Sequence, residues 1–171
     1  ACFNATSKVG NGLLIPAGPL RENLSNLSKY DAVFINGKKK NNKLKNKIKY
    51  YNNKIELFQS EYKIKNLNKF DRSKKFLAFS GIGSPWEFKN TLIKNKFKIE
   101  DYLTFPDHYN YSKIDILKIH SRAKKKGLKI ITTEKDYLRL NKNNQKNIYF
   151  ASIELKIVNQ SSFNKFLIKK L

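Results

Sequence analysis

The stretch "KKFLAFSGIGSP" (74–85) decides how this chain is expected to fold, because an apolar run passes directly into a glycine turn. The run has the composition of a buried strand, and Ser84 or Pro85 then suits the start of a helix, "PWEFKNTLIKN" (85–95). Strands and helices alternate from residue 75 onward. This pattern predicts an α/β fold with a mainly parallel sheet flanked by helices, a Rossmann-like α/β/α lobe.

The rest of the second half follows the same signals. Further elements are expected as strands at 97–105, 128–133 and 147–157, and as helices at 113–127, 133–141 and 161–171. Ser112 and Thr133 are placed to cap their helices, and Gly127 is placed to end one.

The first half is less regular. It is expected to hold a strand end at 1–4, a Gly- and Pro-rich loop at 7–22, a short helix at 19–30, a strand at 31–38, a charge run at 38–49 that forms an exposed helix or a solvated loop, and one or two strands at 50–67. A length of 171 residues fits one domain.

Composition narrows the class of protein. The chain is 40% hydrophobic, so it can bury a real core, and no apolar stretch approaches the roughly 20 residues that span a bilayer. The single Cys2 excludes an internal disulfide. The formal net charge of +23 comes almost entirely from lysine, whereas phosphate and base recognition favour arginine. We therefore interpret most of the charge as compositional drift, and a role at a membrane surface stays open.

Conspicuous polar or glycine-rich turns follow four of the expected strands. They are Asn36-Gly37, Gly81-Ile82-Gly83, Pro106-Asp107-His108 and residues 132–136. Because parallel strands end at the same edge of a sheet, and ligands bind in the crevice beyond that edge, these turns are expected to converge on one site.

Each turn also has a purely structural interpretation. Gly81 and Gly83 can serve only to let the chain turn tightly, and Thr133 with Asp136 resembles a helix-capping box. His108 can be a loop histidine bonded to backbone. His120, by contrast, is expected to be a packed histidine on the 113–127 helix.

No phosphate loop of the form G-x-x-x-x-G-K-[ST] occurs in the sequence, and no pair of histidines has metal-ligand spacing. From the residues alone, the chain is an α/β domain with a candidate site for an anionic ligand, and its chemistry stays open.

Five motifs carry a family resemblance. They are "GNGLLIPAGPLRE" (10–22), "DAVFING" (31–37), "FSGIGSPWEF" (79–88), "FPDHYNYS" (105–112) and "ITTEKD" (131–136). In order and spacing they resemble the C-terminal half of the tetraacyldisaccharide 4'-kinase family. The resemblance implies an enzyme that uses ATP and Mg²⁺ to phosphorylate the 4' position of the tetraacyldisaccharide 1-phosphate precursor of lipid A. It also implies a fold of two α/β/α lobes joined by a small β linker. The enzyme would act at the cytoplasmic face of the bacterial inner membrane.

The family's phosphate loop and paired aspartates have no counterpart in this sequence. The chain is therefore expected to be a C-terminal fragment or a truncated product that is inactive alone, with the Mg²⁺ ligands in the N-terminal lobe and none here. Residues 1–30 would form the junction with that lobe, and residues 31–171 the C-terminal α/β lobe. Its partners would be the lipid A precursor and the inner-membrane surface, with no nucleic acid.

The motifs assign roles by resemblance. His108 matches the family's FPDH histidine, which is expected to pair with an aspartate of the other lobe and help activate the sugar hydroxyl. Asp107 either orients His108 or fixes the turn. Arg21 and Glu22 match the motif at the lobe junction, where Arg21 suits a bidentate contact with phosphate.

Other residues match the family less specifically. Those expected near the nucleotide are Asn36, Gly81, Ile82, Gly83 and Glu87. A further group either contacts the ligand or supports residues that do: Thr133, Glu134, Lys135 and Asp136.

The alternative is a non-catalytic basic domain that binds anionic lipid or RNA. Missing phosphate-loop residues favour such a loss of catalysis, and the scarcity of arginine disfavours RNA.

Overall fold

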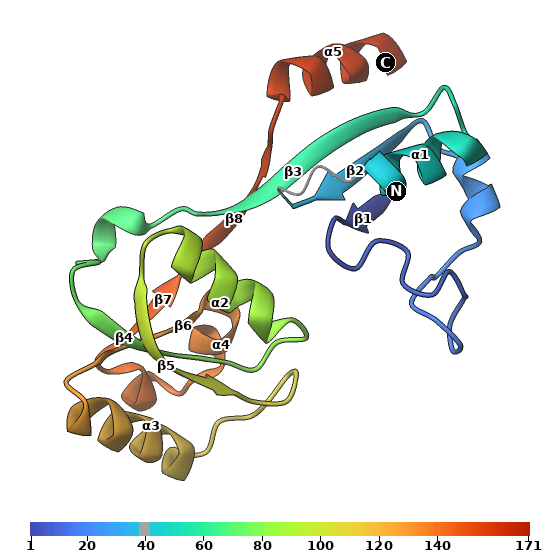
Figure 1. Cartoon of the computed structure of the whole chain (residues 1–171). Helices are drawn as coiled ribbons and strands as arrows, with labels where there is room; N and C mark the ends of the chain where they lie inside the picture. Colours follow the sequence, from blue (N-terminus) through green and yellow to red (C-terminus); the bar gives the residue numbers. More distant parts are fainter. Residues whose placement is uncertain (38–41) are drawn as a thin grey trace. The chain divides into compact units, whose positions relative to one another are not determined.

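The computed structural model describes residues 1–37 and 42–171, which divide into two compact units (Figure 1). Unit 1 comprises Ala1–Tyr62 and Leu155–Leu171, and unit 2 comprises Lys63–Glu154. The division therefore differs from the expected boundary at residue 30. The reason is strand pairing, because the strand that follows residue 30 pairs with the first strand of the chain and belongs to unit 1.

The sheet that begins the chain has the strand order β1-β2-β3-β8. Its strands are β1 (Cys2–Asn4), β2 (Ala32–Asn36), β3 (Glu56–Ile64) and β8 (Ile153–Ile157). β2 runs parallel to both β1 and β3. Val33 and Ile35 of β2 pack in one buried cluster with Leu44 and Ile48 of helix α1 (Asn42–Tyr51).

The C-terminal helix α5 (Gln160–Lys170) belongs to unit 1 and packs through aromatic rings. The ring centroid of Phe163 lies 5.1 Å from those of both Phe34 and Phe58. Phe166 lies 5.3 Å from Phe58. Residues more than 100 positions apart therefore form one aromatic cluster in this unit.

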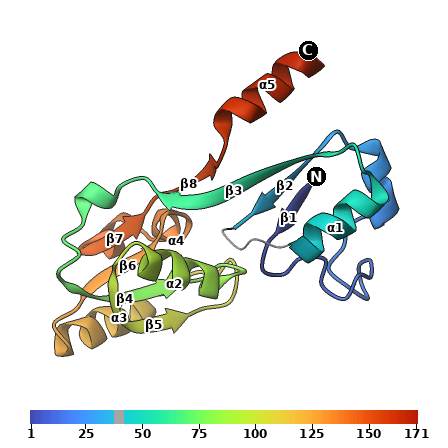
Figure 2. The same ribbon diagram turned by 45° about the horizontal axis from the view of Figure 1, so that its top comes forward.

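Unit 2 is the parallel α/β unit that the alternating pattern predicts (Figure 2). Its sheet has the order β5-β4-β6-β7, from β4 (Lys75–Ser80), β5 (Lys98–Thr104), β6 (Lys129–Thr133) and β7 (Ile148–Ala151). All three strand pairs are parallel. The helices are α2 (Pro85–Lys94), α3 (Lys113–Lys125) and α4 (Glu134–Arg139).

Alternate residues of the central strand β4 face two different hydrophobic clusters. Phe76 and Ala78 pack with Phe88 and Leu92 of α2, while Leu77 and Phe79 pack with residues of α3. Because successive strand residues point to opposite faces, α2 and α3 cover opposite faces of the sheet. The predicted fold class, a mainly parallel sheet flanked by helices, is confirmed.

An ion pair fastens α3 to the edge strand β5. The buried Asp101 carboxylate accepts hydrogen bonds from Arg122 Nε at 2.6 Å and Nη2 at 2.8 Å, and from Lys126 Nζ at 2.9 Å. The hydrogen bond from Arg122, ahead of the one from Lys126, lowers the pKa of Asp101 to about 2. The charge that burial would otherwise penalise is therefore compensated.

Several expected elements take a different form. Residues 19–30 hold a 3₁₀-helix, Leu24–Lys29, because the buried Leu24 and Leu27 are three positions apart and lie on one side of a three-residue turn. Residues 147–157 form two strands, β7 and β8, which join different sheets.

Residues 50–67 hold one strand, β3. Of the charge run at 38–49, residues 42–49 lie in α1 and residues 38–41 lie outside the described residues.

The expected helix boundaries hold in most cases. The hydroxyl of Ser112 accepts a hydrogen bond from the Asp115 N–H in a complete capping box, and Thr133 caps α4. Ser84 precedes α2 without a side-chain capping bond, and Pro85 occupies the first turn. In the described parts of the chain, none of the helices combines the length and apolar character required to cross a bilayer.

Candidate functional site

Three of the four predicted turns meet at the carboxyl edge of the unit 2 sheet. β4 lies between β5 and β6, so the turn after β4 (residues 81–84) is flanked by the loop after β5 (residues 105–112) and by the start of α4. The fourth turn belongs to the other sheet. Asn36 ends β2 of the other sheet, because β2 pairs with β1 and β3, so the expectation of one shared sheet edge was wrong for this residue.

The loop after β5 holds His108 in an unusual backbone conformation. Its φ angle is 60°, in the left-handed region that non-glycine residues rarely adopt. Its N–H group donates to the carbonyl of Gly81 at 3.2 Å and to Asp107 Oδ1 at 2.9 Å. Strained backbone of this kind persists where the surrounding contacts over-determine it, and it is frequent at functional sites.

Aromatic side chains pack the same loop against the hydrophobic core. The rings of Phe105, Tyr109 and Tyr111 lie within 5.0–5.3 Å of one another, centroid to centroid, and Tyr111 lies 5.3 Å from Phe79 in the core. These aromatic side chains therefore connect the loop to the hydrophobic core.

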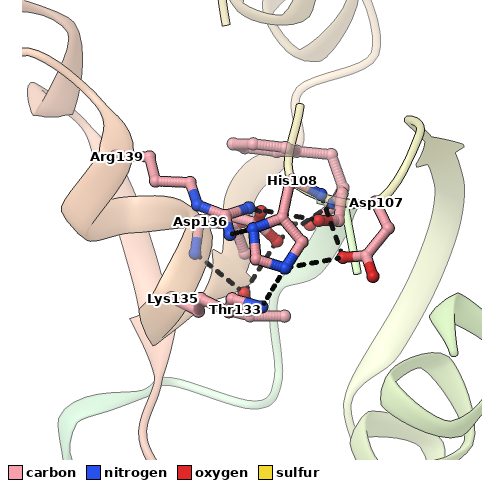
Figure 3. A network of polar contacts seen from close by, with 9 residues as sticks. Asp107, His108, Thr133, Lys135, Asp136 and Arg139 are labelled. Atoms are coloured by element: carbon pink, nitrogen blue, oxygen red, sulfur yellow. Dashed lines mark hydrogen bonds and ion pairs between the residues drawn. The ribbon is translucent and has the colours of Figure 1, made fainter. Parts of the chain in front are cut away.

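The imidazole of His108 lies between two basic side chains of α4 (Figure 3). Arg139 Nη2 is 2.9 Å from Nδ1, and Lys135 Nζ is 3.3 Å from Nε2. Asp107 Oδ1 lies 3.9 Å from Nε2, on the same side of the ring as Lys135. The side chain of His108 is 70% exposed, so the ring is accessible from solvent.

A buried carboxylate anchors this cluster to the sheet. Asp136 is fully buried, and its Oδ2 accepts hydrogen bonds from the Gly81 N–H at 3.0 Å and from the Thr133 hydroxyl at 2.7 Å. Thr133 in turn accepts from the Asp136 N–H at 3.0 Å. A buried carboxylate is stable only with such hydrogen-bond partners. Because Asp136 bonds both Thr133 and Gly81, it connects the start of α4 to the turn after β4.

Arg139 connects all three turns, and it is the main site residue that the sequence interpretation missed. Besides its contact with His108, its Nη1 donates to the carbonyl of Gly81 at 3.3 Å and lies 3.5 Å from Asp136 Oδ1. The available signal was its spacing. Positions three and four before it on the helix are Asp136 and Lys135, which places all three on one face.

Gly81 has a structural role in this arrangement. Its N–H and carbonyl are engaged by Asp136, His108 and Arg139. A Cβ atom at Gly81 would lie 2.9 Å from the Tyr111 hydroxyl and 3.0 Å from the carbonyl oxygen of Pro106.

The other residues of this turn are placed differently. Ile82 packs against the core, Gly83 is exposed beside Asp107, and Glu87 lies in the first turn of α2. Nucleotide contacts by Gly81, Ile82, Gly83, Glu87 and Asn36 stay predictions.

The hydroxyl of Tyr111 is buried and has no hydrogen-bond partner among the described residues. Burial, and then the nearby Asp136 carboxylate, raise the pKa of Tyr111 far above its usual range. Tyr111 is therefore neutral at any physiological pH, and its buried hydroxyl group lies near the Asp136 carboxylate. Glu134, at the start of α4, faces away from this network, because its carboxylate accepts from the Ser152 hydroxyl at 2.7 Å.

Arg21 and Glu22 lie in unit 1, where they line a hollow of about 410 Å³ together with Leu24 and Tyr30. The Glu22 carboxylate accepts from the Tyr30 hydroxyl at 2.9 Å, and this hydrogen bond raises the pKa of Tyr30. Arg21 is exposed, and its predicted contact with phosphate stays a prediction.

Metal binding finds no support in the described parts of the chain, since no three or more His, Cys, Asp or Glu side chains gather there as a candidate site. The described residues therefore offer no donor set that fits Mg²⁺. Where the family's Mg²⁺ ligands lie stays a prediction.

The parallel α/β unit brings a histidine loop, a glycine turn and the start of α4 together at the carboxyl edge of its sheet. This places it in the class of open α/β folds, in which that edge is the usual ligand-binding position. The sequence matches the family model described as tetraacyldisaccharide-1-P 4'-kinase over residues 1–171, so the chain belongs to that family.

Individual relatives agree with the family match. The chain is 43% identical over 169 residues to the tetraacyldisaccharide 4'-kinase of Pelagibacter ubique (strain HTCC1062), covering 98% of this chain and 54% of the relative. The enzyme of the same name from Rickettsia akari (strain Hartford) is 40% identical over 162 residues, covering 94% and 48%. The chain thus spans about half the length of the curated relatives that it matches.

One solved structure has a similar fold. It is the LpxK crystal structure from Aquifex aeolicus, described as being in complex with ATP. The TM-score is 0.61 at 20% sequence identity, covering 98% of this chain and 50% of that chain. At this identity the likeness supports the fold alone.

Proposed function

We propose that this chain is the C-terminal part of a kinase that transfers phosphate from ATP to the 4' hydroxyl of the tetraacyldisaccharide 1-phosphate precursor of lipid A. The observation that carries the proposal is the family match over all 171 residues. The arrangement of His108 supports it, because a strained loop at the edge of a parallel sheet presents an accessible imidazole next to two cations.

In this proposal His108 acts at the sugar hydroxyl, together with a carboxylate outside this chain. Phosphoryl transfer depends mainly on positioning and on neutralising charge. Lys135, whose ammonium is exposed beside Nε2 of His108, supplies positive charge where phosphate groups would arrive. ATP and Mg²⁺ would be held chiefly by residues that are not in this chain, so the chain alone would transfer no phosphate.

We also propose that the protein works at the cytoplasmic face of the inner membrane, where its substrate is a lipid. This location is proposed from the lipid substrate alone, since most of the net charge of +23 is interpreted as compositional drift.

The test is phosphate transfer by the complete gene product that contains this chain, with ATP, Mg²⁺ and the disaccharide precursor. His108→Ala is expected to lower kcat about 10²–10⁴-fold, the usual contribution of an acid–base group, with little change in the KM for ATP. The 171-residue chain alone is expected to form no 4'-phosphorylated product.

His120→Ala is the matched control, because it removes the second imidazole from a different element, α3. It should keep turnover per folded molecule, with folding checked by thermal melting. Near-normal kcat in His108→Ala would refute the role of His108. If the wild-type product forms no phosphorylated disaccharide but binds anionic vesicles, the alternative of a non-catalytic lipid-binding domain would replace the kinase.

A further inference from the structure

We infer that Arg139 is a positioning residue that sets the orientation of the His108 ring and decides which ring nitrogen carries the proton. The kinetic part of this inference rests on the proposed function, whereas the structural part does not. Arg139 lies beyond the ITTEKD motif at residues 131–136.

The hydrogen-bond donors beside the His108 ring determine which ring nitrogen accepts. A guanidinium group and an ammonium both only donate hydrogen bonds, so each would need the ring nitrogen that it faces to accept. The contact from Arg139 Nη2 to Nδ1 of His108 is the shorter, at 2.9 Å against 3.3 Å from Lys135 Nζ to Nε2, and we therefore take Nδ1 as the acceptor. In the neutral ring the proton then lies on Nε2. His108 therefore presents an N–H donor at Nε2, which suits a hydrogen bond to the carboxylate that the proposed function pairs with it.

Arg139 is itself held in place by the turn after β4 and by Asp136. Its side chain is 20% exposed, and its Nη1 reaches both the Gly81 carbonyl and Asp136 Oδ1. Asp136 is itself fixed by the Gly81 N–H and Thr133. The contacts with Gly81 and Asp136 thus fix the planar guanidinium group. Its hydrogen bond to His108 then restricts the orientation of the imidazole (Figure 3).

Lys135 differs from Arg139, although it also touches the ring. An ammonium has no lone pair, so its contact with Nε2 at 3.3 Å places two donors face to face in this tautomer. No other hydrogen bond from the Lys135 ammonium is found among the described residues, and the side chain is exposed. Lys135 is therefore expected to turn toward any anion that arrives, and it is the matched control for Arg139.

The test is nitrogen NMR of the chain with ¹⁵N-labelled histidine, at a pH where the rings are neutral. The chain has only two histidines, so His120 serves as an internal reference. In the wild type, His108 Nδ1 should give an unprotonated signal shifted by an accepted hydrogen bond, and Nε2 a protonated one. Arg139→Leu should move the Nδ1 signal to the position of a ring without that bond. Lys135→Leu should leave it in place.

A protonated Nδ1 in the wild type would overturn the inference, and so would an unchanged Nδ1 signal in Arg139→Leu. If Arg139→Leu fails to fold, Arg139→Lys replaces it. The ammonium keeps the charge beside Asp136 but cannot bridge Gly81, Asp136 and His108 together, so the Nδ1 signal should still move.

The kinetic arm uses the complete gene product. Arg139→Lys should lower kcat about 10–100-fold, as for groups that orient a functional histidine through its second nitrogen, without raising the KM for ATP. In a His108→Ala background the same substitution should change kcat by about threefold or less, because it acts through the ring.

Equal effects of Arg139→Lys in both backgrounds would overturn the positioning role. If the wild-type gene product shows no kinase activity, the proposed function fails, and the NMR result alone decides the inference.

Discussion

Gly81 is the residue at which the three turns of unit 2 meet. Its carbonyl oxygen accepts hydrogen bonds from the His108 N–H and from the Arg139 guanidinium, and its own N–H donates to the Asp136 carboxylate. The nearest atoms around a Cβ at this position include the backbone carbonyl of Pro106, which cannot move away as the end of a side chain can. Space, and not a left-handed φ angle, therefore requires glycine here.

At this scale we predict that Gly81→Ala lowers the free energy of unfolding by about 1–3 kcal/mol, the usual cost of overpacking, and displaces the 105–112 loop. Denaturant unfolding measures the first effect, and the chemical shifts of His108 measure the second.

Gly83→Ala is the control for this prediction. Its Cβ would meet only the end of the Asp107 side chain, at 3.3 Å, which can shift. Equal losses in the two variants would mean that crowding by the backbone of the loop is not the reason for glycine at position 81.

The start of α4 combines a helix cap with the anchor of the site. Thr133 accepts from the Asp136 N–H as an ordinary cap does, and its hydroxyl also donates to the buried Asp136 carboxylate. Ser112 caps α3 with the same spacing, but its partner Asp115 is partly exposed. The Thr133 cap thus also stabilises a buried carboxylate, whereas the Ser112 cap bonds a carboxylate that water can reach.

For this element we predict that Thr133→Ala costs about 2–3 kcal/mol, the sum of a lost cap and a weakened buried carboxylate, while Ser112→Ala costs about 1 kcal/mol. Thr133→Ser keeps the hydroxyl and should recover most of the loss. Thermal and denaturant unfolding of the three variants measure these values. A Thr133→Ala variant as stable as Ser112→Ala would show that the carboxylate contact contributes nothing.

At the scale of the whole molecule, the two units have separate cores, and unit 1 is built from both ends of the chain. Phe163 of α5 packs on Phe34 and Phe58 in unit 1. In unit 2, the buried Phe97 packs on Phe70 and Phe76.

We predict that Phe163→Ala speeds amide hydrogen exchange in β1, β2 and α1 and leaves the protection of β4 and β6 unchanged. Phe97→Ala should do the reverse. The reason is that each substitution removes aromatic packing within one unit only, at a cost of about 1–4 kcal/mol that depends on burial. Exchange measured by mass spectrometry on both variants checks the pattern, and a uniform loss of protection in either variant would contradict two separate cores.

Local patterns in the sequence determined the element types and the three turns that meet at His108. Strand and helix periodicity, the caps at Ser112 and Thr133, and the glycine turn at residues 81–83 act within a few residues, so they can be read without the fold. Because these signals are local, they do not show which sheet a strand joins. Asn36 was therefore assigned to the same sheet edge as the turn after β4, although β2 and β4 belong to different sheets.

Only the tertiary structure decided which side chains contact His108. Arg139 is 31 positions from His108 and Asp136 is 55 from Gly81, so their contacts depend on β4 lying between β5 and β6. The split of residues 147–157 into two strands was likewise decided by pairing, because β7 completes one sheet while β8 joins another. Strand order is set by packing across the whole chain, and no window of local sequence contains it.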